Sequence, residues 1–277
     1  MSKPIRASGR QLGVSAAVSI VGVLFALPFI AMFASSFRRS SDVREQPLNP
    51  LHGGLTLENY RQVWRETDVV AYFVNSAITT TSIVVLQVIL AVGAAYSLGH
   101  LQPWGHRYLR AVIVVVLSIP VPAIAISNYL ALARFDLIDT RASLVIPFVA
   151  TAFGVFLLTQ YVEAVPVQQI DAARAFGLGP WRRFRLVFLP NIRPGVAALA
   201  AFSFVGWWNE FFWPFIVLRT DRLATVPFLV RRFEISPTGL PDWGPLMAAA
   251  TITLIPVAGL LVLLQRSFAQ TLRFTAN

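Results

Sequence analysis

Six long apolar segments, separated by short polar ones, constrain the fold of this chain more than any other feature of its sequence. Each reaches the length of about 20 predominantly apolar residues that a helix needs to cross a bilayer. Unpaired backbone groups are very costly in hydrocarbon, so these segments must be helices; β-barrel strands would be shorter and would alternate in polarity. The predicted spans are Gly13–Phe37, Ala71–Leu98, Ala111–Ala133, Ala142–Tyr161, Gly195–Leu218 and Gly244–Leu264.

The composition supports a membrane environment. Of the 277 residues, 56% are hydrophobic and only 13% are charged, whereas soluble domains carry about 25% charged residues. A net charge of +10 would suit a nucleic-acid partner, but the basic residues lie in short segments between apolar runs, as in membrane-flanking loops. We therefore expect an all-α fold, a polytopic membrane protein with six transmembrane helices in a single domain over residues 1–277.

Several classes of chemistry are excluded or disfavoured. The absence of cysteine excludes disulfides, thiolate metal sites and cysteine nucleophiles. The three histidines, His52, His100 and His106, do not have a metal-ligand spacing, so we expect no metal site. No phosphate-binding P-loop pattern and no nucleophile–base constellation is found in the chain, which predicts a protein that is not an enzyme and binds no cofactor itself.

The first span predicts an uncleaved anchor, since it is longer than a signal-peptide core and no A-x-A site closes it. Six spans would place both termini on one side of the membrane. If that side is cytoplasmic, the inner segments hold 12 of the 23 Lys and Arg residues and the outer loops 11, so the positive-inside rule barely decides. The basic residues before the first span favour an inner N-terminus: Lys3, Arg6 and Arg10.

The loops and the proline positions give further expectations. The outer loop, Arg38–Val70, is expected to be extended chain followed by a short helix that begins near Thr56 and runs through Trp64. Pro120, Pro122 and Pro147 are expected to kink or end helices.

The inner loop, residues 162–194, has two predicted helices. Pro166 suits the first turn of a helix over Val167–Phe176, and Gly177 is a natural stop. This helix lacks a bulky apolar stripe, so it is better suited to docking into a partner's groove than to holding the membrane. Two short helices around a glycine also resemble a helix-turn-helix, but membrane tethering on both sides argues against DNA binding.

The second helix of this loop begins at Pro180. Trp181, Phe184 and Phe188 form one aromatic stripe with arginines off it, a pattern typical of an interfacial helix. Pro190 and Pro194 are expected to end that helix before the fifth span.

At these residues the chain resembles a known family. The stretch "DAARAFG", followed after eleven residues by "LP", resembles the E-A-A-x-x-x-G loop of binding-protein-dependent ABC transporter permeases, in particular the carbohydrate-uptake branch of the maltose and glycerol-3-phosphate type. Other stretches match that branch in order, from about Gly13 to about Phe268: "NSAITTTSIVVLQVILAVGAAYSL", "FVGWWNEFFWPFIV" and "DWGPLMAAATITLIPVAGLLVLLQRSF".

The resemblance implies a type I ABC importer permease fold and half of a translocation pore for a carbohydrate, polyol or glycerol-phosphate-type solute. It implies that Pro166–Gly177 is a coupling helix seated in a cleft of a cytoplasmic ATPase subunit. The implied coupling residues are Pro166, Gln169, Asp171, Ala172, Ala173, Arg174, Gly177 and Pro190.

The implied partners are a second homologous permease, two copies of the ATPase, which holds ATP and Mg, and an extracytoplasmic solute-binding protein. The implied location is the bacterial inner membrane with both termini in the cytoplasm.

This sequence departs from the family at three places. Asp171 stands at the usual glutamate position, and Phe176 stands where an acid usually precedes the glycine. The end "QTLRFTAN" lacks the family's small-residue and Lys-Gly tail.

Glu210 is the one charged residue within the predicted spans. A carboxylate at that depth costs about 2.5–3.5 kcal/mol and usually faces a bundle interior or a wet cavity. Together with Asn209, Trp207 and Trp208 it offers the hydrogen-bonding groups and flat rings of a sugar or polyol site. The alternative is a packing role at a helix break. Weaker pathway candidates, which could equally bond across helices, are Gln87, Asn75 and Asn128.

A secondary transporter driven by an ion gradient is the alternative function. Against it, the six spans show no internal repeat, and one carboxylate offers little for proton or sodium coupling.

Overall fold

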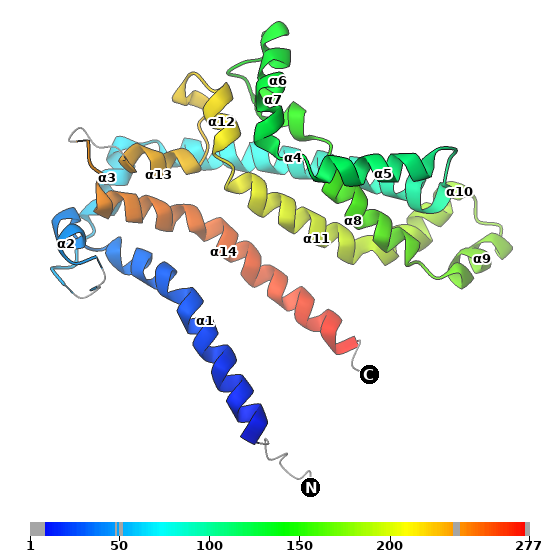
Figure 1. The fold of residues 1–277 in the computed structure, drawn as a ribbon, viewed down its shortest axis with the longest axis horizontal. Coiled ribbons are helices and arrows are strands. Elements are labelled where there is room, and N and C mark those ends of the chain that lie inside the picture. Colours follow the sequence, from blue (N-terminus) through cyan, green and yellow to red (C-terminus); the bar gives the residue numbers. More distant parts are fainter. Residues whose placement is uncertain (1–8, 48, 50–51, 235–238, 275–277) are drawn as a thin grey trace. The chain divides into compact units, whose positions relative to one another are not determined.

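The computed structural model describes residues 9–47, 49, 52–234 and 239–274, and the regular structure among them is helical apart from one isolated bridge between Arg38 and Leu55. The chain divides into two compact units (Figure 1): Met1–Val69 with Leu229–Gly259, and Val70–Phe228 with Leu260–Asn277.

The predicted membrane-spanning architecture is confirmed within the described residues. Four helices are long and apolar enough to cross a bilayer, and the number rises to six if each of two bent helix pairs is one span. The four are Ala17–Ser35, Val69–Leu101, Pro180–Trp208 and Trp243–Val262, and the pairs are His106–Leu117 with Val121–Arg134 and Arg141–Phe148 with Ala152–Glu163.

The first unit contains α1 (Gly9–Ser35), α2 (Ser40–Glu45), α3 (Glu58–Glu66) and the first part of α14 (Trp243–Phe274). Arg38 organises the loop between these helices. Its guanidinium is buried and donates to the carbonyl oxygens of His52 at 2.8 Å and Asp42 at 2.7 Å. Asn59 on α3 donates to the Arg38 carbonyl at 2.7 Å, which holds α3 against the same loop.

The expectation of an extended outer loop was therefore wrong at α2. Arg38 also donates to the carbonyl of Gln46 at 3.1 Å, so one side chain provides partners for carbonyls at the end of this short helix. The second predicted helix of the loop is confirmed as α3, and Thr56 Oγ1 accepts a hydrogen bond from the Glu58 amide at 3.0 Å.

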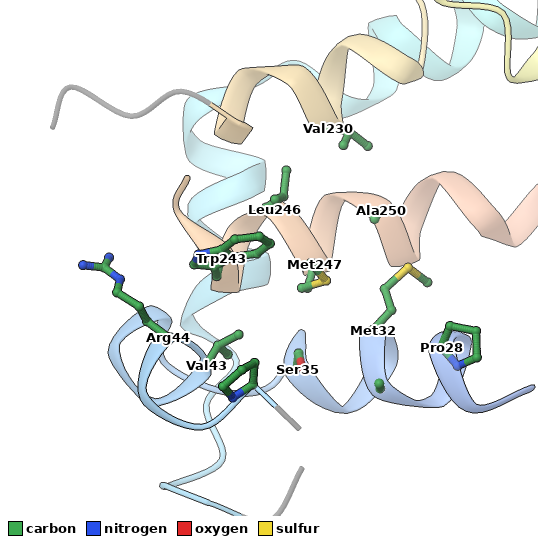
Figure 2. A pocket seen from close by; sticks show the side chains of 12 residues that line it. Pro28, Met32, Ser35, Val43, Arg44, Val230, Trp243, Leu246, Met247 and Ala250 are labelled. Atoms are coloured by element: carbon green, nitrogen blue, oxygen red, sulfur yellow. The ribbon is translucent and has the colours of Figure 1, made fainter. Parts of the chain in front are cut away.

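An apolar groove of about 740 Å³ lies in this unit (Figure 2). Its walls come from α1 and the start of α14, with α2 at one end. Its lining is Pro28, Ala31, Met32, Ser35, Val43, Arg44, Pro47, Val230, Trp243, Leu246, Met247 and Ala250.

The second unit carries most of the helices. They are α4 (Val69–Tyr96), α5 (His106–Leu117), α6 (Val121–Arg134), α7 (Arg141–Val145), α8 (Ala152–Glu163), α9 (Val167–Ala175), α10 (Pro180–Arg183), α11 (Leu189–Trp208) and α12 (Phe212–Val217), followed by α13 (Pro227–Glu234) at the boundary between units. Two turns are π-helical, Ser97–Leu101 after α4 and Phe184–Phe188 before α11. The core around them includes Ala95, Leu158, Phe188, Ile192 and Leu199.

Two predicted spans are bent rather than continuous. The segment expected at Ala111–Ala133 breaks at residues 118–120, and α5 and α6 meet at 100°. Pro120 lies at this break with extended backbone and begins α6 as its N-cap, because it has no N–H and disfavours a helical residue before it. The fourth segment bends by 44° between Phe148 and Ala152, just after the short turn that contains Pro147.

The fifth span differs at both ends from the prediction. It runs from Pro180 to Trp208 without the expected stop at Pro190 and Pro194. Pro190 lies two residues after the end of the π-helical turn, in the first turn of α11, and a π turn leaves a carbonyl without a regular partner, which is where a residue lacking an N–H fits. At the other end α11 stops at Trp208, so residues 209–218 do not continue the span.

The interfacial interpretation of the aromatic stripe was also only partly right. Trp181 is 72% exposed, but Phe188 is 1% exposed and contacts Tyr96 of α4.

Two glycines of α11 provide a test of how this helix packs against α8. A Cβ on Gly195 would lie 2.5 Å from the Tyr161 ring of α8, whereas a Cβ on Gly206 would meet nothing within 4 Å. We expect Gly195→Ala to destabilise the protein by about 1–3 kcal/mol, since the ring cannot move without overpacking its neighbours. Thermal unfolding of the detergent-purified protein measures this, with Gly206→Ala as the matched control; equal melting temperatures for the two variants would contradict the packing.

Candidate functional site

The helix α9, which carries the "DAARAFG" stretch, has well-defined ends. Pro166 is its N-cap residue, where the missing N–H costs nothing. At the other end the Gly177 amide donates to the Arg174 carbonyl at 2.9 Å and the Leu178 amide to the Ala173 carbonyl at 3.0 Å. This is the Schellman pattern, and it requires the positive φ of +70° that Gly177 adopts.

One face of α9 packs against the core of its own unit, the second. Ile170 and Ala173 are buried, and Ile170 belongs to the core cluster that contains Phe188 and Ile192. Gln169 adds a polar link, because its Oε1 accepts a hydrogen bond from Asn191 on α11 at 2.9 Å. These contacts attach α9 to α11 as well as to α8, from which the chain enters it.

The opposite face of α9 is exposed to solvent. It includes Asp171, Ala172, Arg174 and Phe176, and the Phe176 side chain is 84% exposed. Asp171 and Arg174 form an ion pair of 3.1 Å with each other, and both side chains are more than half exposed. Of the two alanines among the implied coupling residues, Ala172 is exposed and Ala173 is buried.

Asn209 and Glu210 lie at the break between α11 and α12. The Asn209 side chain donates to the Val205 carbonyl at 2.8 Å, near the end of α11. Glu210 Oε1 accepts a hydrogen bond from the Trp213 amide at 3.0 Å, in the first turn of α12. Glu210 therefore satisfies an amide that the break leaves without a helical partner, as the packing interpretation expects. The Val205 carbonyl also accepts a hydrogen bond from the Asn209 amide at 3.3 Å, so the Asn209 side chain adds a second bond there.

The neighbouring tryptophans pack against other rings. Trp208 is buried between Phe204 and Phe73, and Trp207 lies 4.4 Å from the Phe148 ring, centroid to centroid. Gln87 reaches the same place, since its amide donates to the Phe148 carbonyl at 2.8 Å. The structure therefore brings Gln87 and Trp207 together around Phe148. The Gln87 Oε1 is buried and has no hydrogen-bond partner among the described residues.

Asn75 is part of a different contact. Its side chain donates to the carbonyls of Arg222 at 3.0 Å and Ala224 at 3.1 Å and accepts from Arg141 at 2.9 Å. The next residue, Ser76, accepts a hydrogen bond from the Val226 amide at 2.7 Å. Asn75 thus fixes the loop after α12 to α4, while Asn128 lies half-buried on α6.

Asp139 fixes a second loop to the segment after α12. It accepts hydrogen bonds from the Arg219 amide at 3.1 Å and the Thr220 hydroxyl at 3.0 Å. Burial by itself raises the pKa of Asp139, but these hydrogen bonds and the charge of Arg222 outweigh it and hold the pKa below its ordinary value. The carboxylate is therefore ionised at neutral pH. Nothing in the local sequence pattern points to this role, because the partners lie 80 residues away.

The described residues form a helical membrane protein with a short proline-to-glycine helix between two spans, and comparison with known proteins gives its family. Residues 87–274 match the family described as binding-protein-dependent transport system inner membrane component. The chain belongs to this family of ABC transporter permeases.

Among its relatives is the diacetylchitobiose uptake system permease protein NgcG of Streptomyces coelicolor, 32% identical over 250 residues that cover 89% of this chain and 82% of that protein. The arabinooligosaccharides transport system permease protein AraQ of Halalkalibacterium halodurans is 25% identical over 90% of each chain. The sn-glycerol-3-phosphate transport system permease protein UgpE of Brucella abortus is 27% identical over 92% of this chain and 93% of its own.

A solved structure has the same fold. It is the crystal structure of a bacterial ABC transporter involved in the import of the acidic polysaccharide alginate, with a TM-score of 0.78 and 21% identity over 96% of this chain and 100% of that one. The resemblance seen in the sequence is thus confirmed. The chain is a multi-pass permease subunit of an inner-membrane importer and not itself an enzyme, and such a transporter also comprises an ATPase and a solute-binding protein. The secondary-transporter alternative is not supported.

The end of α9 provides a second prediction. Gly177→Val places a β-branched residue at a φ of +70°, which costs about 1–2 kcal/mol and should make amide exchange at residues 176–178 roughly 5–30-fold faster. Hydrogen–deuterium exchange measures this in the membrane-inserted protein. Gly179→Ala is the control, since Gly179 has a φ of −65° and open space around its Cα; equal exchange in both variants would contradict the Schellman end.

Proposed function

We propose that this chain forms half of the translocation pore of an importer for a carbohydrate, polyol or glycerol-phosphate-type solute. The other half is a second homologous permease, and two copies of a cytoplasmic ATPase hold ATP and Mg. The proposal is supported by the relatives, which are named for the uptake of diacetylchitobiose, arabinooligosaccharides and sn-glycerol-3-phosphate. In this arrangement residues 162–194 are the coupling loop of one permease domain, and both termini are cytoplasmic.

The observation that carries the coupling proposal is the two-sided character of α9. One face is held by the core and by Gln169, while the other exposes Asp171, Arg174 and Phe176. A short rigid helix of this kind can transmit the closure of an ATPase pair as a rigid-body movement.

The exposed face of α9 also indicates what its partner offers. Asp171 and Arg174 are both accessible, so the Asp171–Arg174 pair can exchange for a contact with a basic group of the ATPase. Phe176, at 84% exposure, replaces the usual acid with an apolar ring, and we propose that it enters an apolar part of the ATPase cleft. Burial of such a ring contributes about 1.5–3 kcal/mol.

The solute pathway is proposed to pass the break between α11 and α12. One carboxylate oxygen of Glu210, Oε1, accepts the hydrogen bond from the Trp213 amide, and Asn209 is exposed beside it. Hydroxyl-rich solutes are recognised by such carboxylate and amide groups next to aromatic rings. Trp207, Trp208, Gln87, Asn75 and Asn128 are proposed as secondary pathway residues, and the packing of the two rings makes them walls of the path rather than free stacking platforms.

Transport in vesicles tests the function as a whole. We expect uptake by the reconstituted transporter, with its ATPase and binding protein, to require ATP and to be unaffected by ionophores. Asp171→Lys and Gly177→Val should insert normally but hydrolyse ATP with about 10-fold less uptake per ATP. Uptake that persists without ATP and is abolished by an ionophore would contradict the importer proposal.

Glu210→Gln tests the pathway separately from the fold. Gln keeps an Oε1 that can accept from the Trp213 amide, so stability should be unchanged, while loss of a charge-assisted hydrogen bond to solute, about 1.5–3 kcal/mol, should lower uptake at saturating binding protein about 10-fold or more. Glu234→Gln, at an exposed site at the end of α13, is the control. Native uptake by Glu210→Gln would leave Glu210 with only its helix-break role.

A further inference from the structure

We propose that Arg110 on α5 is a positioning residue for energy coupling, which ties the end of α8 beside the coupling helix to the π-helical turn that ends α4. The inference rests on the proposed docking of α9 to an ATPase. Arg110 lies outside the "DAARAFG" stretch, so its proposed role is not a direct contact with the ATPase. The role follows from the two elements that its side chain connects.

The guanidinium of Arg110 contacts two elements at once. It forms an ion pair with Glu163, the last residue of α8, and donates a hydrogen bond to the Leu98 carbonyl oxygen in the π-helical turn. The side chains of Arg110 and Glu163 are only 31% and 34% exposed, so the pair is partly shielded from solvent. The Arg110 Nε is buried without a hydrogen-bond partner among the described residues. A side chain held in this way fixes the elements that it contacts relative to each other.

Both contacts lie next to the coupling loop. Glu163 precedes Pro166, the N-cap residue of α9, by three positions. Leu98 belongs to Ser97–Leu101, where α4 ends irregularly and the following residue, Gln102, has a left-handed φ of +48°. A cation at the carboxyl end of a helix interacts favourably with its dipole and with its unpaired carbonyls. Arg110 therefore closes the end of α4 and the end of α8 with one group.

The π-helical turn is also packed tightly on α8. A Cβ on Gly99 would lie 2.8 Å from Val162 Cγ1, so the two elements approach as closely as a glycine permits. This contact and the Arg110–Glu163 pair lie at consecutive positions of α8. The end of α8 cannot move away from α4 without breaking both.

The second π-helical turn completes the connection. The ring of His100, in the first turn, lies 4.3 Å from the ring of Phe188, in the second, and Tyr96 lies 4.9 Å from Phe188. α9 itself packs against this second turn. π-helical turns are rare and are often found at functional sites, and here two of them interlock directly beside α9. Movement of α9 therefore reaches α4 by two routes, through Phe188 and through Arg110.

The double contact needs arginine and not only a positive charge. A planar guanidinium can hold a carboxylate and a carbonyl in fixed directions, whereas a lysine ammonium is a point charge on a flexible stem. Arg110→Lys therefore keeps the charge and loses the geometry. Arg107, on the same helix and exposed, is the matched control.

The test uses the complete transporter in vesicles, with ATP hydrolysis and solute uptake measured on the same preparation. We expect Arg110→Gln and Glu163→Gln each to reduce solute moved per ATP about 10-fold, with Arg110→Lys in between and Arg107→Gln at the native ratio. The double variant Arg110→Gln/Glu163→Gln should be no worse than Arg110→Gln alone, because Glu163→Gln removes only a contact that Arg110→Gln has already removed. Native ratios in the Arg110 and Glu163 variants, or additive losses in the double variant, would overturn the proposal.

A distance measurement separates positioning from simple destabilisation. The chain contains no cysteine, so spin labels can be placed at Val167→Cys on α9, which is not one of the implied coupling residues, and Leu90→Cys on α4, both exposed positions. The distance between the labels should stay the same with and without ATP in the native background and should change with ATP in Arg110→Gln. An unchanged distance in Arg110→Gln would overturn the proposal even if uptake falls.

The two proposals fail in different ways. If Gly177→Val uncouples hydrolysis from uptake and the Arg110 variants do not, the positioning role is wrong and the coupling helix stands. If neither Gly177→Val nor Asp171→Lys uncouples, the function proposed for α9 is wrong.

Discussion

The need to pair every backbone N–H and C=O in hydrocarbon is the constraint on which the rest of this structure depends. Continuous helices meet it by themselves, and α1 and α4 do so over 27 and 28 residues. At two of the interruptions, side chains provide the missing partners. At the end of α4 this is Arg110, which donates to the Leu98 carbonyl, and at the start of α12 it is Glu210, which accepts from the Trp213 amide. The interruptions are thus where polar side chains acquire fixed positions, and the candidate functional residues gather there.

The same constraint explains what could be predicted from the sequence. Apolar length predicted the helical membrane architecture, and the Pro166 and Gly177 positions predicted α9 nearly to the residue, because the signals for a helix start and stop are local. The expected interruption at Pro120 is confirmed, because this proline lies at the break between α5 and α6. The size of the 100° bend and the end of α11 at Trp208 were missed, because an apolar run has the same composition whether it is straight or broken.

The missed functional contacts have a related cause. Arg110, Glu163 and Asn191 lie outside any motif, and their partners are distant in the sequence or belong to the backbone. The predicted helix end at Pro190 was wrong although its signal is local and strong. The helix continues through this proline because a π-helical turn lies just before it. Sequence reasoning therefore located the coupling helix and not the side chains that attach it to the spans.

The exposure of α1 has a consequence for how its sequence can vary. None of the side chains in its most apolar window is buried within this chain, while a third of the corresponding window of α4 is. Outside the groove wall formed by Pro28, Ala31 and Met32, the internal packing of the subunit thus demands little more than hydropathy from this window of α1. On α4 the demand is for particular shapes and hydrogen-bonding groups, such as Asn75 and Gln87. Two spans that are both long and apolar enough to cross a bilayer therefore differ in how much information their sequences must carry.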